Sequence, residues 1–458
     1  MRKFIGLFLA IILSASFMQA QVKVYSDYYA VYFKDKAGTP YSIDKPEQFL
    51  SKKSIDRRKK FDIPINKQDL PVSPVYVKKL QDAGFEVIKV SKWLNCAIVK
   101  TENIANYTKL SSMDFVINKP EPLAKDYRYK TYKRYKSKEK LEQSKDKYNY
   151  GKALTQTQML NINLLHNEGY TGKGVTIAIL DGGFFHVNEL PAFKSLWKNG
   201  QIKGWYDFVD MDTTVFDEGT HGMMVLSTIG GNTEQLVGTA PDADFWLFVT
   251  EDGDSEYPIE EYNYVIAAEM ADSIGVDIIH SSLGYADFDD KSLSYKYEDL
   301  NGNTAVSTIG ADIASSKGIL VVTSAGNEGN DPWRYVSAPA DADSILAVGA
   351  VNFKGKYGSF SSQGPSYDNR IKPEVCAQGV SATVQLSNGR IGTANGTSFS
   401  GPIMAGAVAC LVQAFPDKSN MEIIEAVIRN SSQAKSPDEK LGYGIPDFYK
   451  AFKYLEKR

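Results

Sequence analysis

The stretch Val175–Gly183 reads VTIAILDGG, a short run of aliphatic and β-branched residues that ends in an aspartate and two glycines. Similar apolar runs and intervening helical patterns follow it: strands are expected at Val175–Leu180, Phe245–Val249, Val276–Ser281, Ile319–Ser324 and Ile345–Val351, and helices at Glu260–Ser273 and Thr308–Lys317. Continuous apolar strands that alternate with helices are typical of a parallel sheet covered on both faces. From Gly151 onward the sequence therefore predicts an α/β domain.

Polar residues follow two of these strands directly. Asp181 ends the first strand, and Asn327 lies in the glycine-rich turn after the strand that ends at Ser324. Open parallel sheets place their functional groups at the carboxyl ends of the strands. A third candidate, Ser398, lies in NGTSFSGP just before the apolar stretch Ile403–Phe415, where a serine hydroxyl would be held at a helix N-terminus.

A histidine completes the set, because His221 stands in GTHG between Asp181 and Ser398. Amide hydrolysis needs a nucleophile, a base that returns the proton to the leaving amine, and donors for the oxyanion. Ser398 would attack, His221 would move the proton, and Asp181 would hold the imidazole. Asn327 and the Ser398 backbone N–H would bind the oxyanion. Each residue alone has a structural explanation, as a helix cap or a turn residue; their joint order and contexts favour the catalytic interpretation.

These motifs resemble those of the subtilisin-like serine peptidases, the subtilase family, over nearly all of Gly151–Leu455. The resemblance implies a subtilisin-like fold and a serine endopeptidase with catalytic Asp181, His221 and Ser398 and the oxyanion donor Asn327. It also implies that extended polypeptide substrates bind between Ser282-Leu283-Gly284 and Ser324-Ala325-Gly326. Supporting segments are GTAPDA at 238–243, ILAVGA at 345–350, FSSQGP at 360–365 and KPEV at 372–375.

The sequence departs from the family motifs at a few positions. Met223 replaces the threonine of His-Gly-Thr, Ser227 replaces a common glycine, and Phe399, Ser400 and Gly401 follow the serine where Met-Ala-x is usual. None of these changes removes a reacting atom. Activity is therefore expected, and the alternative is a catalytically inactive subtilase-like binding protein. An α/β-hydrolase esterase is disfavoured because its serine comes first in the chain, whereas Ser398 comes last.

The segment Val24–Ile117 has the predicted order strand, helix, strand, strand, helix, strand, with Pro46–Lys60 as a helical extension. This is the order of a ferredoxin-like α+β unit. In the family such a unit is a prosegment that guides folding, inhibits the enzyme and is removed by it. We therefore expect a prosegment at 21–120, a charged linker with the processing site at 121–150 and a peptidase domain at 151–458. A separate adhesion or binding domain is the alternative for the first unit.

The amino terminus carries basic residues, an apolar run at Phe4–Ile12 and small residues up to Ala20, which is the order of a signal peptide. A signal at 1–20 predicts a secreted or periplasmic protein, and no later segment predicts a membrane span. The net charge of −3 argues against a nucleic-acid partner. The tyrosine- and lysine-rich stretch Lys125–Tyr150 could stack on bases, but its interspersed acidic residues favour a solvated linker.

The remaining expectations concern metals, cysteines and specificity. Cys96, Cys376 and Cys410 are expected to be buried thiols, with a Cys376–Cys410 bridge as the alternative. No cofactor is required; the acidic insert Tyr285–Thr304 could bind a structural calcium, although a solvated loop is favoured. Neither substrate-binding segment carries a charge, so an apolar or aromatic residue is expected before the scissile bond. A monomer is expected.

Overall fold

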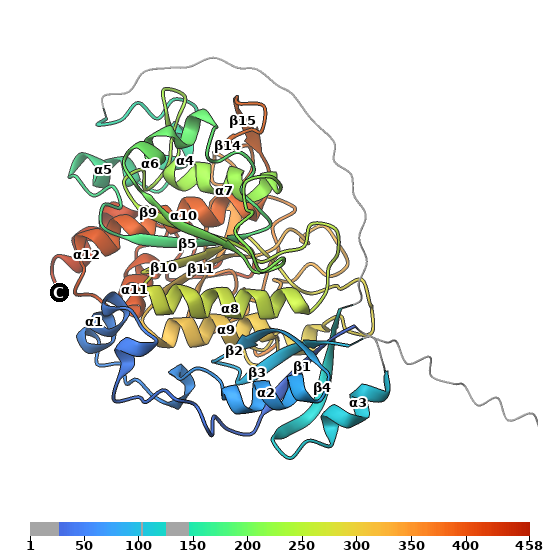
Figure 1. Ribbon diagram of the computed structural model, residues 1–458. Coiled ribbons are helices and arrows are strands. Elements are labelled where there is room, and N and C mark those ends of the chain that lie inside the picture. The colour runs from blue at the N-terminus through green and yellow to red at the C-terminus, as the bar shows by residue number, and fades with distance from the viewer. Residues whose placement is uncertain (1–26, 102–103, 125–145) are drawn as a thin grey trace, which may run out of the picture.

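The computed structural model describes residues 27–101, 104–124 and 146–458, which form two packed units (Figure 1). The larger unit contains a seven-stranded sheet in the order β13-β12-β11-β10-β5-β9-β6, in which all neighbouring strands are parallel. The strands are β5 (Thr176–Asp181), β6 (Ile202–Asp207), β9 (Asp244–Val249), β10 (Ile278–Ser281), β11 (Leu320–Ser324), β12 (Leu346–Val351) and β13 (Val375–Gln378). The predicted parallel α/β sheet is confirmed.

Helices cover both faces of this sheet (Figure 1). On one face lie α7 (Thr220–Gly230) and α10 (Thr397–Ala414); on the other lie α8 (Ile259–Ile274) and α9 (Val306–Ser316). Smaller elements complete the domain: α4 (Leu154–Gln158), α5 (Ile162–Asn167), η3 (Pro191–Phe193), α6 (Lys194–Lys198), β7 (Asn232–Thr233), β8 (Leu236–Val237), η4 (Tyr297–Asp299), β14 (Ala382–Gln385), β15 (Ile391–Ala394), α11 (Asn420–Arg429) and α12 (Phe448–Leu455).

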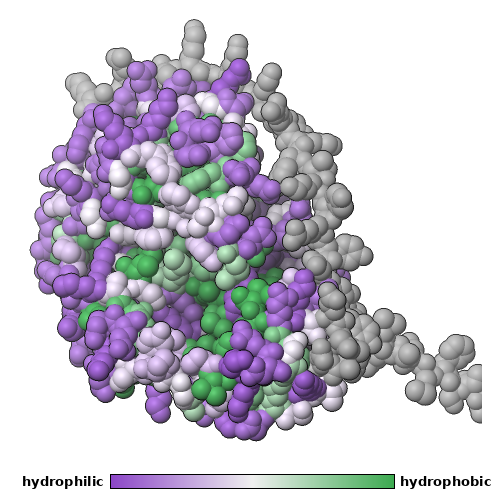
Figure 2. Space-filling view, viewed as in Figure 1, coloured by the Kyte–Doolittle hydropathy of each residue, from purple (hydrophilic) through white to green (hydrophobic). Residues whose placement is uncertain are grey.

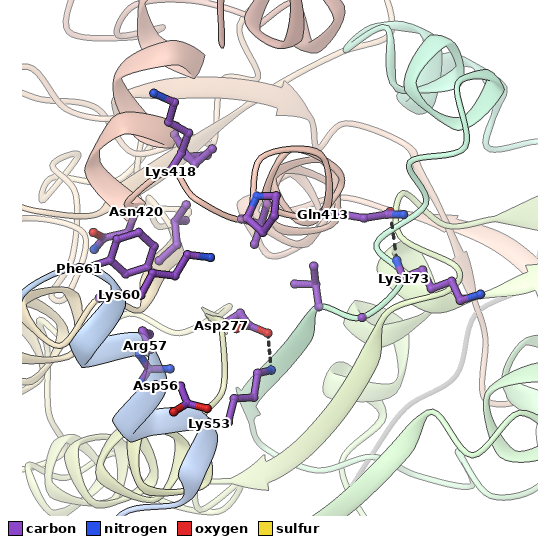
Figure 3. A pocket seen from close by; sticks show the side chains of 17 residues that line it. Lys53, Asp56, Arg57, Lys60, Phe61, Lys173, Asp277, Gln413, Lys418 and Asn420 are labelled. Atoms are coloured by element: carbon purple, nitrogen blue, oxygen red, sulfur yellow. Dashed lines mark hydrogen bonds and ion pairs between the residues drawn. The ribbon is translucent and has the colours of Figure 1, made fainter. Parts of the chain in front are cut away.

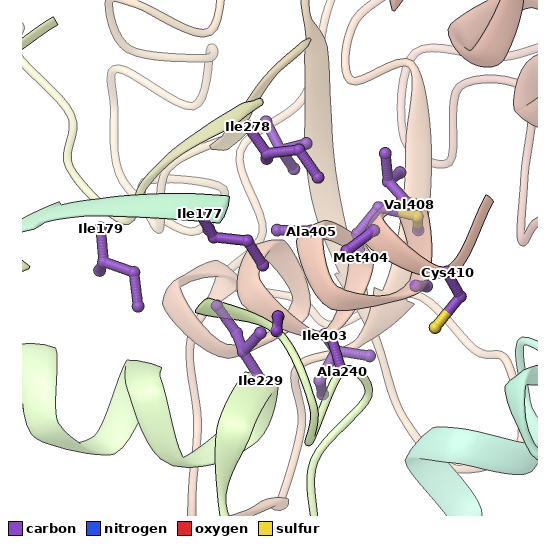
Figure 4. Packing of buried hydrophobic residues seen from close by; sticks show 14 of the residues in the cluster. Ile177, Ile179, Ile229, Ala240, Ile278, Ile403, Met404, Ala405, Val408 and Cys410 are labelled. Carbon is purple, nitrogen blue, oxygen red and sulfur yellow. The ribbon is translucent and has the colours of Figure 1, made fainter. Parts of the chain in front are cut away.

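The helix α10 runs through the centre of the domain, where it packs among Ile177, Ile229 and Ile278 (Figure 4). Among the described residues it is the one helix whose length and apolarity would suit a membrane span, and 83% of it is buried inside the protein. Its apolar surface faces the sheet and the surrounding helices. We therefore describe it as the core helix of the domain, and it carries Ser398 in its first turn.

The smaller unit has an antiparallel sheet in the order β2-β3-β1-β4. Its elements are β1 (Tyr28–Phe33), η1 (Pro46–Gln48), α1 (Lys52–Lys60), η2 (Lys67–Asp69), α2 (Pro74–Asp82), β2 (Glu86–Ser91), β3 (Cys96–Lys100), α3 (Ile104–Ser111) and β4 (Val116–Ala124). Two helices on a four-stranded sheet in this order form a ferredoxin-like fold, as predicted. Two details differ from the expectation: β4 continues past residue 120, and Pro46–Lys60 divides at Ser51, whose side chain caps α1.

The sheet of the smaller unit packs against α8 and forms hydrogen bonds with polar side chains of that helix. The Glu269 carboxylate accepts hydrogen bonds from the Ser91 hydroxyl at 2.5 Å and from the backbone amides of Lys92 and Trp93, each at 2.9 Å. Tyr262 on the same helix contacts the Tyr32 hydroxyl at 2.6 Å. Figure 2 shows that the apolar residues visible on this face gather toward its middle and lower part, with hydrophilic residues around them.

The extension α1 gives the smaller unit a second attachment, near the start of the central strands (Figure 3). The Asp272 carboxylate pairs with Arg57 at 2.7 Å and with Arg58 at 2.6 Å, and all three side chains are buried. Lys53 pairs with Asp277 at 2.6 Å. Removing one partner of a buried ion pair leaves an uncompensated charge, so this cluster fixes how the two units fit together.

The remaining predictions about the fold concern the signal peptide, the linker, the cysteines and the acidic insert. The signal peptide at 1–20 and most of the linker at 121–150 lie outside the described residues. Cys96, Cys376 and Cys410 are all buried and free, which agrees with the thiol interpretation. The insert Tyr285–Thr304 is more than a solvated loop, because Tyr285, Phe288 and Leu300 form a small buried cluster of their own.

Candidate active site

Asp181 and His221 meet at the carboxyl end of the sheet. Asp181 is the last residue of β5 and is fully buried, and His221 is the second residue of α7. The His221 Nδ1 atom lies 2.8 Å from Asp181 Oδ1 and 3.1 Å from Oδ2. The preceding Gly219 has φ +69°, and a side chain there would lie 2.1 Å from the Gly182 carbonyl oxygen. The close approach of these two turns is what brings the imidazole onto the carboxylate.

The hydrogen bond fixes the protonation pattern of the imidazole. A carboxylate only accepts, so Nδ1 carries the proton and Nε2 of the neutral ring keeps its lone pair. Burial alone would lower the pKa of His221, but the charge and hydrogen bond of Asp181 and the charge of Glu251 outweigh it and raise that pKa. His221 is therefore a base whose conjugate acid is stabilised by its partner.

Ser398 is the second residue of α10 and is 8% exposed. Its carbonyl oxygen accepts a hydrogen bond from the Ser282 hydroxyl at 3.0 Å, and that of Thr397 accepts one from the Ser324 hydroxyl at 2.8 Å. The ends of β10 and β11 thus hold the first turn of α10. The Phe399 ring lies with its centroid 6.0 Å from that of His221, which places the start of α10 beside the imidazole.

The described residues include no hydrogen bond between the Ser398 hydroxyl and His221. In free hydrolases this contact is often long and tightens only when substrate is bound. The N–H groups in the first turn of a helix have no intrahelical acceptor. The Ser398 amide is one of these N–H donors, so it can hydrogen-bond to a negatively charged oxygen at this end of α10.

Asn327 follows β11 and is held by the same turn. Its Oδ1 accepts hydrogen bonds from the Thr397 backbone N–H at 2.8 Å and from the Thr397 hydroxyl at 3.1 Å. Because a backbone N–H only donates, the amide oxygen has to face Thr397 and the NH₂ group has to point away from it. The exposed Asn327 therefore presents two N–H donors next to the Ser398 turn.

His280 also lies in this region, although it was not among the site residues expected from the sequence. It is fully buried on β10, with Nδ1 3.0 Å from the Val322 carbonyl oxygen and Nε2 2.9 Å from the Ser282 hydroxyl. Burial lowers the pKa of His280 to about 3, so the ring is neutral. A side chain at Gly401 would lie 2.9 Å from His280 and 2.7 Å from the Ser324 hydroxyl. The His280 imidazole and the Ser324 hydroxyl beneath the serine turn leave no room for a side chain at position 401, which explains the glycine there.

The other departures from the family motifs are also accommodated. Phe399 and Met223 are buried in the main core. The Ser400 hydroxyl donates to the Thr397 carbonyl oxygen at 3.1 Å. The Ser227 hydroxyl accepts from the Gln385 backbone N–H at 2.9 Å, which ties α7 to β14. None of these side chains displaces Asp181 from His221.

The two expected substrate-binding segments flank this site. Ser282-Leu283-Gly284 lines a cavity together with Asp181 and His221. Ser324-Ala325-Gly326 runs from β11 to Asn327, and a side chain at Gly326 would lie 2.4 Å from the Glu328 carboxylate. That carboxylate accepts a hydrogen bond from the Ser362 hydroxyl at 2.6 Å. Glu328 lies outside both segments in the sequence, so the sequence did not predict an acidic group at this wall of the site. The preference for an apolar or aromatic residue before the scissile bond stays a prediction.

For the acidic insert Tyr285–Thr304, a structural calcium site was the alternative to a solvated loop. Within residues 27–101, 104–124 and 146–458, no group of three or more histidine, cysteine, aspartate or glutamate side chains is arranged to hold a metal ion.

Family models match both units. The model described as the subtilase family matches residues 172–444, and the one described as the peptidase S8 propeptide domain of Bacteroidota matches residues 28–144. The chain belongs to the subtilase family. It is 33% identical over 264 residues to subtilisin E of Bacillus subtilis (strain 168), a match that covers 57% of this chain and 61% of subtilisin E. Subtilisin of Bacillus pumilus is also 33% identical, with 57% and 84% covered.

A solved structure aligns with most of the length of this subtilase. The epidermin leader peptide processing serine protease of Staphylococcus aureus aligns with a TM-score of 0.64 at 18% identity, covering 94% of this chain and 99% of that one. At this identity the likeness concerns the fold. The propeptide match establishes the smaller unit of this subtilase as a propeptide domain, which we call the prosegment. The separate adhesion domain is thereby disfavoured.

Proposed function

We propose that this subtilase is an exported serine endopeptidase that hydrolyses peptide bonds through an acyl-enzyme on Ser398 and removes its own prosegment. The observation that carries the proposal is the His221–Asp181 hydrogen bond at 2.8 Å, formed beside the first turn of α10. A neutral imidazole with a fixed tautomer is the base that a serine nucleophile needs. The family match and the subtilisin relatives support the same activity.

The mechanism assigns one role to each group. His221 Nε2 takes the proton as Ser398 Oγ bonds to the scissile carbonyl carbon, and the Asp181 carboxylate stabilises the imidazolium. The Asn327 NH₂ and the Ser398 amide bind the oxyanion. The imidazolium then protonates the leaving amine as the C–N bond breaks. His221 then takes a proton from a water molecule as the water oxygen bonds to the ester carbon, and the imidazolium returns that proton to Ser398 Oγ as the C–Oγ bond breaks.

Covalent labelling tests the nucleophile. A fluorophosphonate probe is expected to modify the processed protein once, on Ser398, and to leave the Ser398→Ala variant unlabelled. Ser436→Ala, which removes an exposed hydroxyl elsewhere, serves as the control and should label like the parent protein. Persistent labelling of Ser398→Ala, or none in the processed parent, would contradict the peptidase mechanism and favour the inactive binding protein.

Export and processing are tested by amino-terminal sequencing of the protein that leaves the cell. Loss of residues 1–20 is expected in every variant, because a signal peptidase acts independently of Ser398. Loss of the prosegment is expected only where Ser398 is intact. A parent protein that keeps Met1, or a Ser398→Ala protein that is cut in its linker without another protease, would argue against this part of the proposal.

The oxyanion donor gives a separate prediction. Asn327→Leu is expected to lower kcat by about 10²- to 10³-fold with little change in KM, because the donated hydrogen bond strengthens only as the oxyanion forms. Asn330→Leu, which changes an exposed asparagine of the same loop, is the control and should keep its kcat. An Asn327→Leu variant that loses affinity while kcat is unchanged would show that the side chain binds substrate instead.

A further inference from the structure

A cavity of about 500 Å³ opens beside His221 on the side of the loop that joins β9 to α8. One wall is formed by Ser282-Leu283-Gly284, and Asp181 and His221 lie at its inner end. The remaining lining is strongly acidic; its carboxylates are Glu251, Asp252, Asp254, Glu256, Glu260 and Asp289. No lysine or arginine is among the described residues that line it.

The carboxylates of this cavity divide into two groups: four accept hydrogen bonds from described residues, namely Glu251, Asp252, Glu260 and Asp289, and two do not. Glu260 is buried and accepts hydrogen bonds from the backbone amides of Asp252 and Tyr257, so it shapes the loop. Asp252 accepts from the Asp254 amide at 3.1 Å and has a similar role. The side chains of Asp254 and Glu256 are different, because within the described part of the chain no hydrogen bond or ion pair engages either of them.

The acidic groups of the cavity also repel one another. The insert that carries Asp289 is joined to this loop through the Glu256 backbone, whose amide donates to the Asp289 carboxylate at 3.2 Å. Burial, with the charges of Asp289 and Glu261 added, raises the pKa of Glu256 to about 7. A cation placed here would relieve this repulsion and would meet partly desolvated carboxylates, where charge–charge interactions are stronger than in water.

An extended substrate would turn alternate side chains to opposite sides. If the residue before the scissile bond occupies the pocket between Ser282-Leu283-Gly284 and Ser324-Ala325-Gly326, the residue ahead of it faces the other way. The acidic cavity borders the same Ser282-Leu283-Gly284 segment, and its lining includes His221 but no residue of Ser324-Ala325-Gly326. The cavity therefore receives the second side chain before the scissile bond.

The chain itself contains a segment with the matching charge. Residues 125–136 read KDYRYKTYKRYK, which includes six lysine or arginine residues, four tyrosines and one aspartate. The segment lies between the prosegment and the peptidase domain, where processing is proposed. Tyr129 follows Arg128, and Tyr135 follows Arg134. Each pair places an arginine directly ahead of an aromatic residue, which is the order that the two neighbouring pockets would accept.

We propose that Asp254 and Glu256 form a subsite that selects lysine or arginine as the second residue before the scissile bond, and that Arg128 or Arg134 of the linker is its first ligand. The proposal rests on the proposed peptidase function and adds the class of substrate. The processed chain is then expected to begin at Lys130 or Lys136.

The test uses matched peptides with the active, processed protein. Two fluorogenic peptides carry tyrosine before the scissile bond and either arginine or glutamine ahead of it. The arginine peptide is expected to be cleaved with a kcat/KM about 10-fold higher, as for hydrogen bonds to charged groups. The ratio is expected to fall in 1 M NaCl, because salt screens partly exposed charges.

The double variant Asp254→Asn/Glu256→Gln should bring this ratio close to one. The control Glu425→Gln removes an equal kind of charge from α11 and should keep both the activity and the ratio of the parent protein. Equal cleavage of the two peptides by the parent protein would overturn the subsite while leaving the peptidase function intact. Failure to cleave any peptide, together with failure to label with fluorophosphonate, would overturn the proposed function itself.

Processing in the chain is the second measurement. Arg128→Gln/Arg134→Gln is expected to slow release of the prosegment or to shift the cut to another bond, whereas Lys138→Gln, beyond the segment, should leave the mature amino terminus unchanged. An unchanged rate and terminus in the double arginine variant would show that the linker is not the ligand of the acidic subsite.

Discussion

Replacing Ser398 by alanine is expected to lower kcat for peptide hydrolysis by about 10⁶-fold, the size of the loss when the nucleophile of subtilisin is removed. Without Oγ no acyl-enzyme can form, and His221 has no hydroxyl proton to take. The measurement is kcat on a fluorogenic peptide, with the protein supplied processed by added parent enzyme. A residual rate of about 10³–10⁴ over water is expected, because the oxyanion donors still stabilise the oxyanion that forms when water attacks the bound peptide.

The matched control is Ser400→Ala, two residues further along α10. The Ser400 hydroxyl is buried and donates to the Thr397 carbonyl oxygen at 3.1 Å. Its loss is expected to affect stability modestly and kcat far less than the loss of Ser398. If Ser398→Ala kept more than a few per cent of the parent kcat, the nucleophile would have to be another group.

The same variant also reports on maturation. Ser398→Ala should accumulate with the prosegment joined to the peptidase domain, held by the Glu269 hydrogen bonds and by the pairs of Asp272 with Arg57 and Arg58. Mixed with active enzyme, it should be cut in trans. A Ser398→Ala chain that resists cutting in trans would indicate that processing is strictly intramolecular, since the bond would then be reachable only from its own site.

Much of the fold could be predicted from the sequence because its signals are local. The apolar runs that form β5, β9, β10, β11 and β12 are short and continuous, and the structure contains all five within a few residues. The strand β6 was missed because IKGWYD mixes polar and aromatic residues at the sheet edge. The strand β13 was missed because VCAQ is too short to stand out between a Lys-Pro-Glu segment and a glycine.

The pairing of Asp181 with His221 could be anticipated from their order and contexts. The groups that orient the site could not, because they come from separate segments. Thr397 fixes the Asn327 amide from a position 70 residues away, and His280 lies beneath the serine turn from β10. The acidic cavity depends on the loop after β9 and an insert 33 residues later, joined through Glu256 and Asp289. Each of these contacts needs the folded sheet.

Replacing Asp181 by asparagine is expected to lower kcat at neutral pH by about 10⁴-fold, as for this change in other serine-peptidase triads. The asparagine NH₂ can donate to His221 Nδ1, which the carboxylate cannot. The neutral ring would then carry its proton on Nε2 and could not accept one from Ser398. The measurement is kcat for the processed Asp181→Asn protein, with Asp244→Asn at the start of β9 as the control that should keep its kcat.

The pH profile distinguishes this explanation from general damage. In the parent protein the rate should fall as pH decreases through the raised pKa of His221, because only the neutral imidazole is a base. Burial lowers that pKa, and Asp181 is the larger of the two neighbouring charges that oppose burial. Without the carboxylate the pKa should fall, so the acidic limb of the Asp181→Asn profile should move to lower pH. An acidic limb that stays in place while kcat drops would mean that Asp181 does not set the charge of His221.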